Sequence, residues 1–120
     1  MRIAATVIRR RVPGVDQICI VTTVVDARAV ADVLAAAAVA GRLAACAQVS
    51  GPVDSTYWWE SRMETSREWT VVFKTAPDRM EALIDQVRAA HPYEVPEVLV
   101  TWAEGGNPDY AAWLHEQTRP

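Results

Sequence analysis

The segment LAACAQVSGPVDSTYWW (residues 43–59) and the segment REWTVVFKT (67–75) are the most informative parts of this sequence. The second segment alternates apolar and polar residues, which is the period-two pattern of a half-buried strand. In the first, Gly51-Pro52 predicts a bulge or bend, since proline cannot donate to a central strand ladder. With ESRME as the turn, the two segments predict one long antiparallel hairpin over 43–59 and 62–75.

This hairpin is unusually long, because strands in globular proteins commonly have only about five or six residues. It carries four large aromatic residues, Tyr57, Trp58, Trp59 and Trp69. A small domain cannot cover a strand pair of this length, and uncovered aromatic strands invite pairing with another chain. The hairpin therefore predicts a homo-oligomer.

The segments before the hairpin predict a strand and a helix. QICIVTTVV (17–25) is continuously apolar and rich in β-branched residues, as in a central strand. A helix over 27–40 follows, with Asp26 as its N-cap and Gly41 as the glycine that ends it. Its expected buried face consists of Val30, Val33, Leu34 and Ala37.

The segments after the hairpin predict a second helix, a strand and a third helix. Pro77 begins the second helix and Pro92 ends it. Its buried face is Met80, Leu83, Ile84 and Val87. EVLVTWA (97–103) reads as the fourth strand. Asn107 and Pro108 start a short helix, whose expected buried face is Tyr110, Trp113 and Leu114.

The resulting order is β-α-β-β-α-β with an extra C-terminal helix, an α+β, ferredoxin-like sandwich. The length of 120 residues suits a single domain, which we place at 17–120. Residues 1–16 are expected to form a flexible N-terminal extension. Its basic cluster, Arg9 to Arg11, reads as solvated charge on a tail.

The composition excludes several classes of protein. The net charge of −3 and the pI near 5.3 argue against nucleic acid and anionic membranes as partners. No apolar run is long enough for a membrane span, and the N-terminal segment makes a poor signal peptide. Two cysteines, Cys19 and Cys46, do not form a disulfide framework. We expect them to be reduced and buried in a cytoplasmic protein.

Few residues are candidates for metal binding. Cys46 could supply a thiolate for a soft ion such as Cu(I), or could be a small core residue. Cys19 has the same two interpretations. His91 stands at the end of the second helix, where it could act at a site or could cap the last carbonyl groups. His115 is expected to be a solvated surface residue.

The charged residues of the hairpin leave further alternatives open. Lys74 could bind an anion together with free amides at the next helix start, or could be a solvated lysine. Glu60, Glu64 and Glu68 could form a metal or acid–base site, or could belong to a solvated turn. No P-loop, zinc-protease or nucleophile motif is present in the sequence. We therefore expect a protein that is not an enzyme.

Several motifs together resemble the CutA family of divalent cation tolerance proteins. They are RLAACAQV (42–49), YWWE (57–60), FKT (73–75), HPYEVPE (91–97) and NPDYAAWL (107–114). They occur in the order and spacing of the family, and the resemblance as a whole covers residues 17 to 117. The resemblance implies a ferredoxin-like domain similar to PII signalling proteins. It also implies a tight homotrimer with hairpins that wrap neighbouring subunits, and a link to copper and other divalent cations without enzymatic activity.

The resemblance also implies individual residues. The cysteine of LAAC matches Cys46 and the histidine of HPY matches His91, which makes these two the expected metal ligands. Two further copper-ligand positions of some family members are occupied here by Thr22 and Ala90. The hallmark residues of the family are Tyr57, Trp59, Glu60, Lys74, Tyr93, Pro96, Glu97, Tyr110 and Trp113. We expect Lys74, Glu64, Glu97 and Tyr57 to line a small-ligand cleft between subunits.

Three functional hypotheses follow. The first is a non-enzymatic homotrimer implicated in the response to divalent metal ions, copper in particular, that binds metal weakly or through inter-subunit sites. The second is a PII-like sensor of a small anion or nucleotide, bound through Lys74 and the inter-subunit cleft. The third is an uncharacterised enzyme built on Glu64, Lys74, His91 and Tyr93 between subunits.

Overall fold

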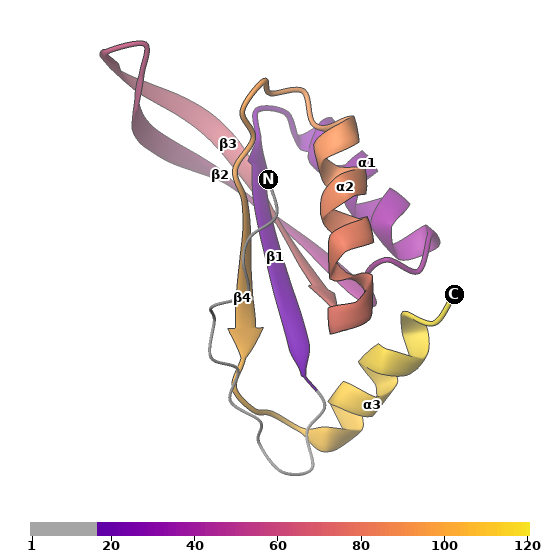
Figure 1. Cartoon of the computed structure of the whole chain (residues 1–120). Coiled ribbons are helices and arrows are strands. Elements are labelled where there is room, and N and C mark those ends of the chain that lie inside the picture. Colours follow the sequence, from indigo (N-terminus) through magenta and orange to yellow (C-terminus); the bar gives the residue numbers. More distant parts are fainter. Residues whose placement is uncertain (1–16) are drawn as a thin grey trace.

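The computed structural model describes residues 17–120, and the predicted extension 1–16 lies outside the described residues. The described part has the predicted α+β order (Figure 1). Its elements are β1 (Ile18–Val25), α1 (Arg28–Ala40), β2 (Cys46–Trp59), β3 (Arg62–Thr75), a 3₁₀ turn (Pro77–Arg79), α2 (Met80–Ala90), β4 (Val98–Ala103) and α3 (Pro108–Gln117). The four strands form one antiparallel sheet in the order β2-β3-β1-β4.

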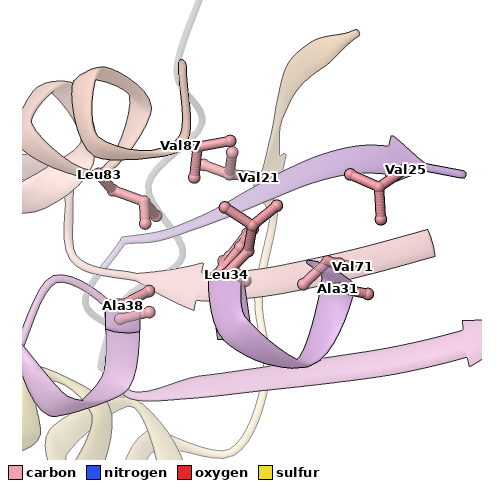
Figure 2. Close-up of a cluster of buried hydrophobic side chains, with 10 residues drawn as sticks. Val21, Val25, Ala31, Leu34, Ala38, Val71, Leu83 and Val87 are labelled. Carbon is pink, nitrogen blue, oxygen red and sulfur yellow. The ribbon is translucent and has the colours of Figure 1, made fainter. Parts of the chain in front are cut away.

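The main core lies between one face of this sheet and the two helices α1 and α2. Figure 2 shows apolar side chains of both helices meeting those of β1 and β3. From α2, the predicted residues Leu83 and Val87 are buried. On α1 the prediction is confirmed for Leu34, which is buried, and for Val30, which packs partly buried against the core. It is wrong for Val33, which is 65% exposed, and for Ala37, which is also exposed. Ala31 and Ala38 are buried in their place. Alanine fits this position because a small side chain lets the helix approach the sheet closely.

The ends of α1 also differ from the prediction. Ala27 occupies the N-cap position and makes no side-chain capping bond, so Asp26 does not cap this helix. At the other end Gly41 has a φ of −80°, and the left-handed conformation falls on Arg42, with a φ of 60°. The backbone amide of Leu43 then bonds to the carbonyl of Ala38, which closes the turn into β2.

The long hairpin is present as predicted. β2 and β3 pair from Cys46 opposite Lys74 to Trp59 opposite Arg62, and the register shifts between Ser50 and Val53. This shift confirms the bulge at Gly51-Pro52. The far end of the hairpin projects away from the rest of the molecule (Figure 1), and it leaves Trp58 74% exposed.

A second, smaller core joins α3 to the end of the sheet. It contains Ile18, Ala76, Ala111 and Leu114. The prediction for α3 was right for Leu114 and wrong for Tyr110 and Trp113, which are 39% and 45% exposed. These two rings pack against each other instead, with centroids 5.5 Å apart.

Among residues 17–120, no helix lies on the face of the sheet opposite α1 and α2 (Figure 1). Successive side chains of a strand point to opposite faces. The neighbours of buried Val21, Val71 and Phe73 therefore point to this uncovered face. We define the uncovered face by Ile20, Thr22, Val24, Cys46, Val72, Lys74 and Leu99, which the strand register places side by side. All seven remain partly or largely exposed in the described chain.

Candidate functional site

A pocket of about 480 Å³ opens where the part of the hairpin beyond its bulge meets the loop between α2 and β4. One wall comes from β2 and β3, and the other comes from residues 93–97 of the loop. Val24 connects the pocket to one end of the uncovered face. The lining residues are Val24, Ser55, Thr56, Tyr57, Trp59, Glu68, Tyr93, Glu94, Val95 and Glu97.

A buried carboxylate and a phenol form the inner part of the pocket. Glu68 is only 4% exposed, and its Oε2 accepts a hydrogen bond of 2.7 Å from the hydroxyl of Tyr93. Burial, followed by the hydrogen bond to Glu68 and the negative charge of Glu68, raises the pKa of Tyr93 well above its usual value of 10. Tyr93 is therefore a neutral hydrogen-bond donor throughout the physiological pH range.

His91 holds the pocket loop in place. Its Nδ1 accepts a 3.1 Å hydrogen bond from the backbone amide of Tyr93, so the proton is on Nε2, which donates to the carbonyl of Val24 at 2.9 Å. The imidazole also meets the ring of Tyr93 edge-on, with centroids 4.8 Å apart. At the other end of the loop, the hydroxyl of Thr23 donates to the carbonyl of Glu97 at 2.6 Å. These hydrogen bonds attach the HPYE segment and the rest of the loop to β1, and they fix the position of the loop that lines the pocket.

The structure separates the two expected metal ligands. Cys46 lies directly opposite Lys74, and Lys74 lies opposite Ile20 on β1. The ring of His91 contacts Val24, four residues further along that strand, which is about 13 Å at the usual rise of a strand. Within residues 17–120, no group of three or more His, Cys, Asp or Glu side chains could hold a metal ion.

The two cysteines differ in accessibility. Cys19 is buried, as expected, whereas Cys46 is only partly buried, because it belongs to the uncovered face. His115 is not simply solvated: its Nε2 donates to the carbonyl of Gln17 at 2.9 Å.

The structure brings together part of the expected small-ligand set. Tyr57 and Glu97 both line the pocket. Glu64 lies opposite Tyr57 on the projecting part of the hairpin, and it is not among the lining residues. Lys74 is ten positions from Glu64 on the same strand, roughly 33 Å away at the usual rise, and is also outside the pocket.

Sequence reasoning missed the importance of Glu68. The sequence places Glu68 in one group with Glu60 and Glu64 near the turn. In the structure the turn is formed by Glu60 and Ser61, both with positive φ, and Glu68 lies well inside β3. A signal was nevertheless present, because Glu68 directly precedes the alternating apolar segment that starts at Trp69. A carboxylate at the start of a half-buried strand is rarely buried without a partner.

Together, the fold and the pocket define a class of protein: a ferredoxin-like α+β domain with an extended hairpin and an acidic pocket between this hairpin and the loop after α2. Within residues 17–120, no helix is both long and apolar enough to cross a membrane. The model of the CutA1 divalent ion tolerance protein family matches residues 19–117. The chain therefore belongs to the CutA1 divalent ion tolerance protein family.

Individual relatives agree with this assignment. A divalent-cation tolerance protein CutA of Salmonella newport is 40% identical over 91 residues, which are 76% of this chain and 79% of that protein. The chloroplastic protein CutA 1 of rice is 38% identical over 86 residues, 72% of this chain but only 49% of the length of the rice protein.

Solved structures agree with the fold in detail. The crystal structure of CutA1 from rice superimposes with a TM-score of 0.84 at 33% identity, over 88% of this chain and 97% of that chain. The divalent cation tolerance protein of Thermus thermophilus gives a TM-score of 0.82 at 33% identity, over 85% of this chain and 99% of the other. The predicted ferredoxin-like fold with a long hairpin is confirmed.

Proposed function

We propose that this protein is a non-enzymatic homotrimer of the divalent metal ion response, with copper among its ions, that holds metal weakly through sites shared between subunits. The observation that carries the proposal is the uncovered face of the sheet, where Cys46 lies beside Lys74. Family membership supports the link to divalent cations.

The uncovered face supports assembly. The second face of the sheet, which no described helix covers, carries the apolar residues Ile20, Val72 and Leu99, and exposed apolar patches mark surfaces where another chain packs. Leu99 is 59% exposed, and its strand β4 is an edge strand with free backbone groups. The other edge strand is β2 of the long hairpin. Copies of the chain can cover the face and both edges at once in a closed ring.

A metal site would also require assembly of several subunits. The described part of one chain gathers no set of three ligands, so ligands would have to come from more than one subunit. Cys46 is the accessible soft ligand, and thiolates suit Cu(I). Both nitrogens of His91 are engaged within the chain, so His91 would have to release the Tyr93 amide before it could bind a metal.

The pocket supports a second candidate, a sensor of small molecules. Its volume of about 480 Å³ falls within the range of pockets that hold small organic ligands. The enzyme hypothesis has no comparable support, because Glu64 and Lys74 lie far apart on β3 and His91 is used to position the loop. We place the protein in the cytoplasm, because neither Cys19 nor Cys46 forms a disulfide.

Native mass spectrometry of the reduced protein, with and without Cu(II) and Zn(II), tests the proposal. We expect the mass of a trimer that takes up copper, and we expect Cys46→Ser to remain a trimer and lose most of that copper. Glu104→Gln is a control on the exposed loop after β4 and should change neither. A monomer would contradict the proposed assembly, and equal copper uptake by Cys46→Ser would contradict the proposed ligand.

A further inference from the structure

The pocket between the hairpin and the loop after α2 also indicates what kind of ligand it takes. We propose that it binds a small organic molecule through a protonated amine, with Glu68 as the carboxylate that receives the ammonium group. This inference names the ligand class for the second candidate function, sensing of a small molecule, and rests on it. It is independent of metal binding at Cys46.

The charge of the pocket favours a cation. Three carboxylate side chains line it, Glu68, Glu94 and Glu97. Among residues 17–120, no lysine, arginine or histidine side chain is part of the lining. The nearby charge of Asp26 adds to the negative potential that acts on Tyr93. The negative charge of the pocket would repel an anion or a nucleotide phosphate. The anionic ligand that Lys74 was expected to bind therefore does not suit this pocket.

Glu68 leaves one acceptor without a partner. Its Oε2 is bonded to Tyr93, whereas Oε1 has no hydrogen-bond partner and no cation among residues 17–120. No fully buried side-chain oxygen in this part of the chain lacks a partner. The pocket that Glu68 lines supplies open space beside its carboxylate. A carboxylate that is 4% exposed and has no counter-charge within the described residues favours a ligand that brings both charge and N–H donors.

The walls of the pocket suit an ammonium ion with an organic body. Tyr57, Trp59 and Tyr93 all line the pocket, and aromatic faces attract cations through their negative quadrupole. The hydroxyl of Tyr57 is held by Ser66 at 2.7 Å, which restricts the ring. The same rings provide apolar area for carbon atoms of the ligand.

A bare metal ion fits the pocket less well. The volume of about 480 Å³ exceeds the space that one ion and its ligands need, and it matches an organic molecule. The carboxylates that line the pocket do not form a metal-ligand cluster within the described residues. An organic amine accounts for the size, the charge and the aromatic walls together.

Isothermal titration of the assembled protein with three matched probes tests this inference. The probes are 2-phenylethylamine, which is cationic, 2-phenylethanol, which is neutral, and 3-phenylpropanoate, which is anionic. We expect saturable binding of the amine, at least about tenfold weaker binding of the alcohol, and none of the anion. Equal binding of amine and alcohol, or binding of the anion, would overturn the inference, and so would the absence of amine binding.

Variants locate the binding site. Glu68→Gln keeps an acceptor for Tyr93 and removes the charge, so it should weaken amine binding by at least about tenfold. Glu97→Gln, on the exposed rim, should weaken it by a smaller factor. Glu104→Gln, outside the pocket, should bind as the unchanged protein does. Unchanged affinity in Glu68→Gln would overturn the role of Glu68. If Glu68→Gln fails to fold, the comparison of the three probes with the unchanged protein still shows whether the pocket prefers an amine.

The same samples separate this inference from the proposed function. Their native masses report the oligomeric state, and copper uptake reports the metal site. A copper-binding trimer that ignores the amine would contradict the ligand class alone. A monomer that binds the amine would contradict the assembly alone.

Discussion

Gly51 occupies a backbone conformation that a residue with a side chain would tolerate poorly. Its φ is 140°, in a region that side chains rarely adopt, and an added Cβ would lie 2.9 Å from Cδ1 of Trp69 and 3.0 Å from the carbonyl oxygen of Glu68. Gly51→Ala should therefore lower the free energy of unfolding by about 2 kcal/mol. Chemical denaturation at a fixed protein concentration measures this change.

The matched control is Gly106→Ala. Nothing lies within 4 Å of the Cβ that this change would add, so the free energy of unfolding should stay within about 0.5 kcal/mol of the unchanged protein. Equal stability of Gly51→Ala and Gly106→Ala would show that the bulge relaxes around a side chain.

Tyr93 should make the stability of the protein sensitive to alkaline pH. Burial and Glu68 raise its pKa in the folded state, while the unfolded chain has the usual value near 10. Its stabilising contribution is thus fully present below about pH 10 and is lost as the pH rises from there toward the folded pKa. Between about pH 8 and pH 11, the free energy of unfolding should fall more steeply than in Tyr93→Phe.

The control for this measurement is Tyr110→Phe. Tyr110 is a surface residue of α3 outside the pocket, and its replacement should leave the alkaline slope as it is. A slope in Tyr93→Phe identical to that of the unchanged protein would contradict the assignment of the effect to Tyr93.

At the scale of single elements, α3 depends on its N-terminal cap. The side chain of Asn107 accepts a 3.0 Å hydrogen bond from the amide of Asp109. Asn107→Ala leaves this amide without a partner and should lower the free energy of unfolding by about 1 kcal/mol. Asn107→Asp retains the acceptor and should cost much less. Urea denaturation of the two variants would contradict this prediction if both lost the same stability.

The hairpin shows how one element can serve two parts of the molecule. Beyond the bulge at Gly51, it supplies Tyr57 and Glu68 to the pocket, while the neighbouring residues Trp58 and Met63 remain largely exposed. The alternation of side chains along a strand accounts for this difference, because Tyr57 and Trp58 are consecutive residues and point to opposite faces of the hairpin. One face of this part is therefore a wall of the pocket, and the other face is exposed.

At the scale of the whole molecule, the uncovered face should control assembly. Val72 lies in the middle of this face, opposite Thr22 and Gln48. Val72→Glu would bury a repeated carboxylate at a subunit interface, which is costly without a partner. We expect the main species in light scattering after size exclusion to shift from trimer to monomer, with circular dichroism that still shows a folded chain.

Val33→Glu is the matched control for assembly, because Val33 is 65% exposed on α1, away from the uncovered face. It should keep the oligomeric state of the unchanged protein. If Val72→Glu assembles as Val33→Glu does, the interface lies on another surface.

The sequence alone determined the elements and their order. The signals for them were local: periods of two and of roughly 3.6 residues, the prolines at helix starts and the cap at Asn107. Such signals can be recognised without knowledge of the rest of the chain. The family motifs did the same for the fold as a whole. The predicted core face of α1 was right for Leu34 and wrong for Val33 and Ala37, because a run of alanines gives almost no contrast between faces.

Only the tertiary structure decided the site. Tyr93 meets Glu68 across 25 positions of sequence, and His91 meets Val24 across 67. The partners in these bonds are set by how the sheet twists and where the loop after α2 returns to it, and no local pattern carries that information. For this reason the sequence could offer His91 and Glu97 only as candidate site residues. The pocket, the burial of Glu68 and the hydrogen bonds of His91 became visible only in the folded chain.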